Sequence, residues 1–274
     1  MPYRHDDGPL ASVSPPSLLT IAGAPAANEG TGHGPLAGAA ATLLAGLVAL
    51  LVISASIGTA AGFDPRFAPA AIVVYGAIAI IALAGLRYHP HRRFGVPNVI
   101  TTVRAVATAL FAGVLIEAER LDREPLEPWA WGFAAIALFA LVLDGVDGYL
   151  ARRLSLSSRY GARYDMEVDA LLILLLSALA YGLGKAGAFV LAIGLMRYAF
   201  AGAQLALPWL AAELPTSFRR KAICVLQAVA LGAMITPIVQ PPWSQALAAF
   251  TVALLAWSFA VDVVWLARRR RVAA

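Results

Sequence analysis

Cysteine and charge are both scarce in this chain. A single cysteine, Cys224, excludes an internal disulfide, and its apolar neighbours predict that it is a packing residue. Charged residues make up only 14% of the 274 residues, whereas 60% are hydrophobic and the mean hydropathy is +0.75. This composition excludes an ordinary soluble domain and indicates an integral membrane protein. The basic segments lack interleaved aromatic residues, so we expect no nucleic-acid partner.

Eight apolar stretches are long enough to cross a bilayer as helices, which takes about 20 residues each. They cover residues 36–57, 68–86, 99–116, 129–150, 165–184, 186–207, 222–239 and 244–267. The predicted fold is therefore an all-α integral membrane protein with eight transmembrane helices. We expect residues 1–35 to form a flexible tail that is not a signal peptide, and residues 268–274 to form a basic tail.

Basic residues are divided unevenly between the two sides of these spans. Fifteen of the 21 Lys and Arg residues fall on the side that carries both termini, the connectors 87–98 and 151–164 and the segment before Ala222. Four fall on the other side, and Arg104 and Arg197 lie within spans. The positive-inside rule therefore predicts that both termini face the cytoplasm, in a bacterial-type inner membrane.

Acidic residues border two of the apolar spans between Asp144 and Asp169. At about 100° per residue, Asp144 and Asp147 share one helix face, and Asp165 and Asp169 share a face of the next helix. Two facing helices would bring the four carboxylates to one point, where carboxylate oxygens suit a pair of Mg²⁺ or Mn²⁺ ions that bridge a phosphate. Helix capping or interfacial placement is the simpler explanation, but unpaired acids in a membrane are costly and usually functional.

A signature of eight positions in this stretch resembles that of the CDP-alcohol phosphotransferase family. It reads Asp144-x2-Asp147-Gly148-x2-Ala151-Arg152-x8-Gly161-x3-Asp165-x3-Asp169. A looser match, Pro97-Asn98-x2-Thr101-x2-Arg104, resembles the segment that opens the first core helix of the family. The resemblance covers roughly residues 95–267, so the last six spans would form the six-helix catalytic core. Residues 36–94 would add two transmembrane helices and a basic connector.

The resemblance implies transfer of a phospho-alcohol from a CDP-alcohol, here CDP-diacylglycerol, to a hydroxyl acceptor with release of CMP. Asp144, Asp147 and Asp165 would hold two Mg²⁺ or Mn²⁺ ions, and Asp169 would act as the general base and also touch a metal. The residues expected at the CDP group are Asn98, Thr101, Arg104, Gly148, Ala151, Arg152 and Gly161. Glu167 points about 160° away from Asp169 and is excluded from the metal cluster. The family also implies a homodimer.

The acceptor is predicted from basic residues near the signature. Six of them could form an anion pocket: Arg159, Arg163, Arg197, Arg219, Arg220 and Lys221. Glycerol 3-phosphate is the first choice, and inositol phosphate, serine or another alcohol would use the same chemistry. Membrane topology alone would also explain the connector and loop residues, whereas Arg197 lies in mid-span and needs a partner.

Two readings from other functional classes stay open. A metal or ion transporter could use the aspartates as a relay in the membrane, but these acids lie at span ends beside a basic connector. A catalytically silent scaffold is the other reading, and the intact signature argues against it.

Overall fold

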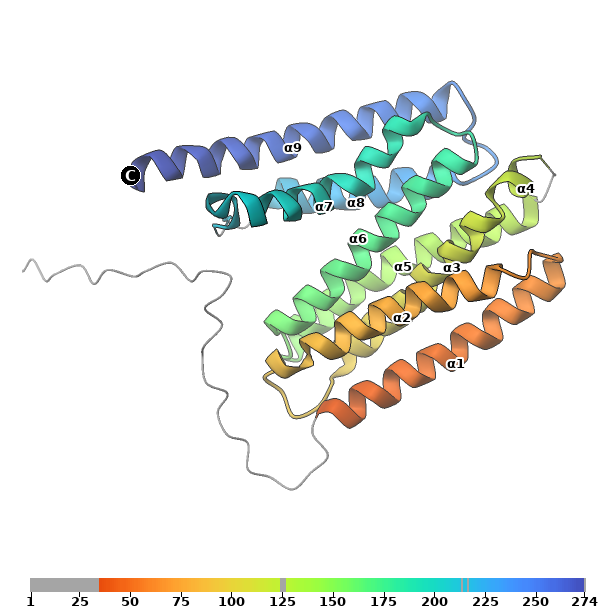
Figure 1. Ribbon diagram of the computed structural model, residues 1–274, viewed down its shortest axis with the longest axis horizontal. Coiled ribbons are helices and arrows are strands. Elements are labelled where there is room, and N and C mark those ends of the chain that lie inside the picture. Colours follow the sequence, from red (N-terminus) through yellow and green to blue (C-terminus); the bar gives the residue numbers. More distant parts are fainter. Residues whose placement is uncertain (1–34, 124–126, 213, 216, 274) are drawn as a thin grey trace, which may run out of the picture.

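The protein is described by a computed structural model for residues 35–123, 127–212, 214–215 and 217–273 (Figure 1). The predicted tail lies outside these ranges except for Pro35. The helices are α1 (Pro35–Ala61), α2 (Phe67–Gly85), α3 (Val96–Ile116), α4 (Ala118–Arg123), α5 (Glu127–Arg153), α6 (Arg159–Gly182), α7 (Leu191–Ala206), α8 (Phe218–Met234) and α9 (Trp243–Ala273). Three short 3₁₀ helices are η1 (Leu86–Tyr88), η2 (Ala188–Val190) and η3 (Pro208–Ala211). The described ranges contain no strand, so the predicted all-α fold is confirmed.

Each of the eight predicted spans coincides with one long helix. Within the described ranges, six helices are long and apolar enough to cross a membrane, namely α1, α2, α3, α5, α7 and α9. Helix α6 falls outside this group because charged residues run through its first half, and α8 has only 17 residues and opens on Arg219, Arg220 and Lys221. Both nevertheless lie alongside the other helices in the same bundle (Figure 1). The eight-span count is thus supported directly for six helices.

Helix α3 lies at the centre of the bundle. It contacts α1, α2, α5 and α6, and 72% of the residues in its apolar stretch are buried, against 17% in α1. Many of its buried residues are small, including Ala105, Ala109 and Gly113. Because lipid is as apolar as a protein interior, helices in a bilayer associate through close packing, which small side chains permit. Helix α3 can therefore carry polar groups into the middle of the protein.

Two apolar clusters hold the bundle together on opposite sides of α3. One cluster includes Phe111, Leu176 and Leu231 from α3, α6 and α8, and the other includes Leu50 and Tyr75 from α1 and α2. Helices α6 and α7 approach especially closely, since a Cβ added at Gly194 would lie 2.5 Å from the Cα of Leu174. The added pair α1–α2 is thus packed against the same central helix as the rest of the bundle.

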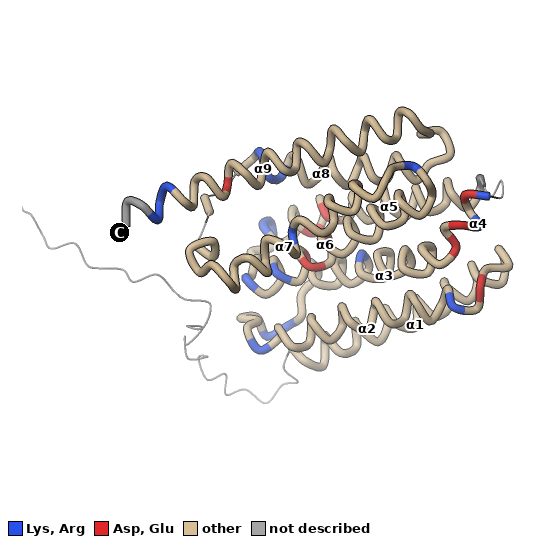
Figure 2. Tube along the Cα trace, turned by 45° about the horizontal axis from the view of Figure 1, so that its top comes forward, with Lys and Arg blue, Asp and Glu red and all other residues tan. Residues whose placement is uncertain are grey.

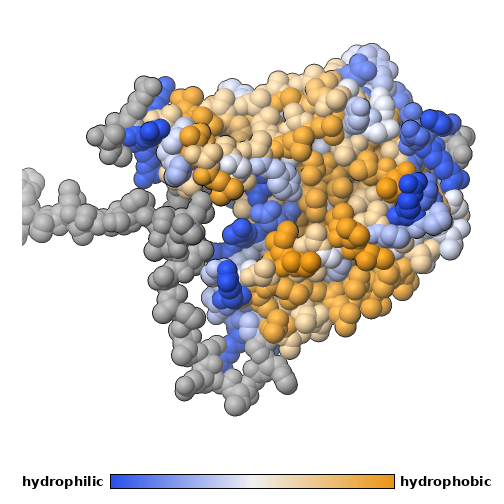
Figure 3. Space-filling view, viewed as in Figure 1, coloured by the Kyte–Doolittle hydropathy of each residue, from blue (hydrophilic) through white to orange (hydrophobic). Residues whose placement is uncertain are grey.

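Charged residues are gathered at the two ends of the bundle and at one internal position. Figure 2 shows Lys and Arg concentrated at the end where α5 meets α6, and acidic residues at the opposite end and midway along α5 and α6. Between the ends, the visible surface is largely hydrophobic, as expected for contact with lipid (Figure 3). Hydrophilic residues also run from the basic end into the seam between the α7 and α2 sides of the molecule (Figure 3).

Candidate active site

Arg104 is the centre of the internal charged cluster. Its side chain is only 1% exposed, and its guanidinium contacts all four signature aspartates. Nη1 lies 3.2 Å from Asp144 Oδ1 and 3.1 Å from Asp147 Oδ2 and also pairs with Asp165, while Nη2 pairs with Asp169. The remaining donor, Nε, bonds to the carbonyl oxygen of Ala140 at 3.1 Å. The guanidinium is therefore fully engaged in holding the acids around one point.

The four carboxylates come from two helices, as their spacing predicted. Asp144 and Asp147 lie on α5, and Asp165 and Asp169 lie on α6. Carboxylate oxygens of Asp144, Asp147 and Asp165 all lie within 4.8 Å of one another, whereas Asp169 joins the cluster through Arg104. Asp147 is buried, but the side chains of the other three are 26–31% exposed. The cluster is therefore open on one side.

The start of α6 sets the direction in which its aspartates point. Ser158 has an extended backbone and its hydroxyl accepts a hydrogen bond from the Gly161 N–H at 2.9 Å, which caps the helix. The helix begins at Arg159, ahead of the predicted span at Asp165, so the aspartates lie in its second and third turns. At about 1.5 Å per residue, Asp169 lies roughly 15 Å from the start of the helix. The acids are consequently further inside the bundle than the predicted span ends implied.

Polar residues of α3 support the acids from behind. The Thr101 hydroxyl lies 3.2 Å from Asp147 Oδ2 and 3.1 Å from the Pro97 carbonyl oxygen. The Asn98 amide donates to the carbonyl of Phe94, and a Cβ at Gly161 would lie 2.9 Å from Asn98 Oδ1. A larger residue at position 161 would force the Asn98 side chain to move. The structure therefore brings Asn98, Thr101, Arg104 and Gly161 together, although their contact with a CDP group stays a prediction.

Tyr164 is a member of the network that the sequence did not reveal. Its hydroxyl lies 3.2 Å from Thr102 Oγ1, and Thr102 in turn donates to the Asn98 carbonyl at 2.8 Å. Because the Thr102 proton is used in that bond, Tyr164 is the donor in the pair. The sequence could have indicated this role, because a tyrosine beside Asp165 needs a partner for its hydroxyl when it is buried. Tyr164 fixes the rotation of α6 against α3 next to the aspartates.

The connector before α3 packs against the same part of α6. The His89 ring lies 5.0 Å from the Tyr160 ring, centroid to centroid, and His89 Nε2 donates to the Arg93 carbonyl at 2.9 Å. The Tyr160 hydroxyl donates to the Ala82 carbonyl of α2 at 3.1 Å. Burial lowers the pKa of His89, so the neutral ring is favoured in the folded protein. The connector before α3 and the end of α2 thus stabilise the start of α6.

The remaining signature residues lie on the last turns of α5. Arg152 turns back over Gly148, where its Nη1 would lie 3.4 Å from an added Cβ. Gly148 and Ala151 are partly buried, and Arg152 is exposed. No carboxylate among the described residues pairs with Arg152. The sequence placed these three residues at the CDP group, and the structure puts them between the acid cluster and the basic end of α5.

Three of the six residues predicted for the acceptor pocket are held by carboxylates. Arg197 lies 3.4 Å from Glu167, and Arg219 and Arg220 lie 2.5 Å and 3.2 Å from Asp262. The others, Arg159, Arg163 and Lys221, are exposed. A phosphate would have to displace existing carboxylates at the first three positions, so they are not a ready-made anion pocket. The partner that mid-span Arg197 required is Glu167 of α6.

The lone cysteine does not have the packing role expected from its neighbours. Cys224 is exposed on α8, whereas Gln227 and Leu231, on the same side of that helix, are buried. Periodicity could not show this, because the apolar run around Cys224 continues without interruption.

The charge balance of the cluster determines what it can bind. One guanidinium faces four carboxylates, so three negative charges stay uncompensated when all are ionised. Such an excess is costly in a low-dielectric interior unless cations offset it. Clustered carboxylate oxygens are the donors that Mg²⁺ and Mn²⁺ prefer. The residues therefore fit a divalent metal centre.

Comparison with known proteins agrees with this donor set. The family described as CDP-alcohol phosphatidyltransferase matches residues 94–263. Proteins named "Putative cardiolipin synthase" from Mycobacterium bovis and two strains of Mycobacterium tuberculosis are 31% identical over 171 residues, covering 61% of this chain and 77% of each relative. No solved structure matches the chain significantly. The family match spans Arg104 and all four aspartates, and we conclude that the chain belongs to the CDP-alcohol phosphatidyltransferase family.

Proposed function

We propose that the protein transfers a phosphatidyl group from CDP-diacylglycerol to a glycerol hydroxyl and releases CMP, as a step of phospholipid synthesis. The observation that carries this proposal is the convergence of Asp144, Asp147, Asp165 and Asp169 on one point. Acidic residues of α5 and α6 lie in the half of the bundle that carries most of the basic residues (Figure 2), and family membership supplies the reaction class.

Each residue of the cluster takes one role in this proposal. Asp144, Asp147 and Asp165 would hold two divalent ions, and Asp169 would also touch a metal. When bound, these ions offset the charge of the diphosphate and of the departing CMP. Arg104 and Thr101 orient the carboxylates, and Arg152 contacts a phosphate oxygen.

The transfer exchanges one phosphorus–oxygen bond for another. The acceptor oxygen attacks the phosphorus of the phosphatidyl group, and the bond from that phosphorus to the CMP oxygen breaks. Asp169 takes the proton of the acceptor hydroxyl at a carboxylate oxygen, which supports attack by about 10²–10⁴-fold. CMP leaves with the electron pair of the broken bond.

The acceptor that we propose is phosphatidylglycerol. Cardiolipin carries two phosphatidyl groups on one glycerol, so a synthase that acts by phosphatidyl transfer needs this acceptor, and the mycobacterial relatives bear the cardiolipin synthase name. The pairing of Arg197, Arg219 and Arg220 with carboxylates also leaves less positive charge for a free phosphomonoester. Glycerol 3-phosphate is the second candidate, favoured by exposed Arg163 and Lys221.

We further propose that the acid cluster faces the cytoplasmic side of a bacterial-type inner membrane and that the protein is a homodimer. The orientation is supported by the basic residues at the end of the bundle nearest the cluster (Figure 2). The homodimer is supported by family membership and is tested by light scattering of the purified protein in detergent.

Purified protein with labelled CDP-diacylglycerol tests the reaction directly. We expect Mg²⁺- or Mn²⁺-dependent CMP release that requires phosphatidylglycerol and disappears in Asp169→Asn. Release with glycerol 3-phosphate alone would select the second acceptor. Metal flux into vesicles without CMP release would instead favour the transporter, and neither activity would favour the scaffold.

A further inference from the structure

The second half of α9 presents two different faces. Trp257, Val261, Val264 and Trp265 are exposed along one side, whereas Ser258, Asp262 and Leu266 are buried on the other. The exposed residues follow the three- and four-residue spacing of one helix face, and Arg268 continues this stripe one turn further. The stripe is thus apolar within the bilayer and ends in a cation.

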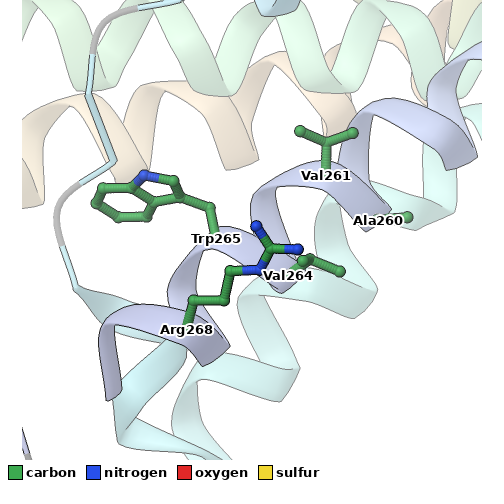
Figure 4. Close-up of a pocket in the computed structure, with 5 residues that line it drawn as sticks. All are labelled: Ala260, Val261, Val264, Trp265 and Arg268. Atoms are coloured by element: carbon green, nitrogen blue, oxygen red, sulfur yellow. The ribbon is translucent and has the colours of Figure 1, made fainter. Parts of the chain in front are cut away.

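A groove follows this exposed stripe. It is shallow and open, with a volume of about 330 Å³, and every residue that lines it belongs to α9: Ala260, Val261, Val264, Trp265 and Arg268. Figure 4 shows the Arg268 guanidinium turned back along the helix toward Val264, with the Trp265 ring pointing away from it. We call this feature the α9 groove. It offers an apolar wall and one cationic group to the same ligand.

Two tryptophans indicate the depth of the groove in the membrane. The guanidinium carbon of Arg269 lies 5.4 Å from the centre of the Trp265 ring, and that of Arg270 lies 5.8 Å from the Trp209 ring of η3. Tryptophan is enriched where headgroups meet acyl chains. Helix α9 has 31 residues, more than the roughly 20 that a span requires, so its last turns extend into the headgroup layer. This length places Arg268 at the depth expected for lipid phosphates.

Among the residues that the structure describes, none forms an ion pair or hydrogen bond with Arg268. The acid of α9, Asp262, is already bound by Arg219 and Arg220. A phosphodiester would supply the missing anion and match the planar donor arrangement of a guanidinium.

We propose that the α9 groove binds one anionic phospholipid, with the phosphate on Arg268 and an acyl chain along Val264, Val261 and Ala260. A zwitterionic headgroup would bring its own cation beside Arg268, Arg269 and Arg270, so the site prefers lipids with net negative charge. The groove shares no residue with the acid cluster, and this proposal does not rest on the proposed reaction.

Lipid retention by the full-length protein in detergent tests the proposal, measured by native mass spectrometry. The probe is phosphatidylmethanol, an anionic phosphodiester that carries no hydroxyl acceptor, compared with phosphatidylcholine. We expect wild-type protein to retain one phosphatidylmethanol more tightly than phosphatidylcholine. Arg268→Gln should weaken this binding about fivefold or more, because one basic residue contributes roughly 1 kcal/mol to attraction of anionic lipid.

Two further variants distinguish lipid binding in the α9 groove from nonspecific attraction to the basic end of the bundle. Val264→Trp fills the groove at an exposed position and keeps every arginine, so it should also lose the bound lipid. Arg87→Gln removes one exposed charge from the same end of the bundle, where Arg87 packs over Tyr88, and should retain the lipid. Equal loss in Arg87→Gln and Arg268→Gln, or full retention in Val264→Trp, would overturn the proposal. Conversion of a dimer to a monomer by Val264→Trp without a change in lipid would show a protein interface instead.

Discussion

Two arginine–aspartate clusters occupy the basic half of the bundle, and their charge ratios are opposite. At the first, one arginine, Arg104, faces four aspartates from α5 and α6. At the second, two arginines of α8, Arg219 and Arg220, share the single carboxylate of Asp262 on α9. Both clusters join helices through charge-assisted hydrogen bonds.

The ratio decides what each cluster can do. In the second cluster two arginines bind one carboxylate oxygen of Asp262, and Arg219 also donates to the Ser258 carbonyl and hydroxyl at 2.7 Å and 2.5 Å. It needs no ligand to be stable and serves to join α8 to α9. The Arg104 cluster has three surplus negative charges and partly exposed carboxylates, so we expect its stability and its proposed function to depend on added cations.

The largest contrast is expected in catalysis. Asp169→Asn should lower CMP release by about 10²–10⁴-fold, because the acceptor loses its general base. Asp262→Asn should leave CMP release within a few-fold of wild type, although it removes a more deeply buried carboxylate. The measurement is the rate of CMP release from CDP-diacylglycerol at saturating Mg²⁺. Equal losses in the two variants would remove the functional distinction between the clusters.

Mg²⁺ should also change the stability of variants in the first cluster and not in the second. Arg104→Met leaves four carboxylates without their guanidinium and should destabilise the protein by about 3–5 kcal/mol in EDTA, with partial rescue by Mg²⁺. Arg219→Met also breaks a buried pair, but Mg²⁺ has no carboxylate cluster to bind there. Thermal unfolding with and without Mg²⁺ distinguishes them. Rescue of both variants, or of neither, would contradict the assigned charge balance.

A smaller effect is expected from the hydrogen bonds that orient each cluster. Tyr164→Phe should cost about 1 kcal/mol of stability and also weaken Mn²⁺ binding, because α6 is then less firmly oriented against α3. Ser258→Ala, the matched change beside Arg219, should cost a similar amount and leave Mn²⁺ affinity unchanged. Unfolding curves and Mn²⁺ titrations of the two variants provide the comparison. A wild-type Mn²⁺ affinity in Tyr164→Phe would show that Tyr164 is only structural.

The smallest expected effect is a pH dependence confined to the connector beside α6. Burial lowers the pKa of His89, so below about pH 6.5 the unfolded chain binds more protons than the folded one. Stability should therefore rise as pH increases toward 6.5 and gain nothing more from His89 above it. His89→Gln should reduce this slope in thermal unfolding between pH 5 and 8. An unchanged slope would show that His89 is not its source.

The sequence predicted one cluster and not the other for a physical reason. Asp144, Asp147, Asp165 and Asp169 lie on two consecutive helices, so helical spacing alone places them face to face. That Arg104 reaches all four depends on the position of α3 between α5 and α6, which no local pattern encodes. Likewise, Arg219 and Asp262 are 43 residues apart, and Asp262 is a single acidic residue in an apolar span, so no local pattern pairs them.

The eight helices were predictable because each span is a long apolar run. The ends of the helices were harder to predict, because the start of α6 at Arg159 depends on the Ser158 cap and not on hydropathy. The pairing of Arg197 with Glu167 was also beyond the sequence, because it depends on the close crossing of α6 and α7 at Gly194.

Mn²⁺ binding to purified protein, followed by electron paramagnetic resonance, tests the central claim most directly. Wild-type protein and Asp262→Asn should bind Mn²⁺ with the same stoichiometry and affinity, and binding should tighten when a CDP-alcohol is added. A variant with Asp144, Asp147 and Asp165 all changed to Asn should bind none. Undiminished Mn²⁺ binding by this triple variant, or no binding by the wild type, would contradict the assignment of the Arg104 cluster as a metal centre.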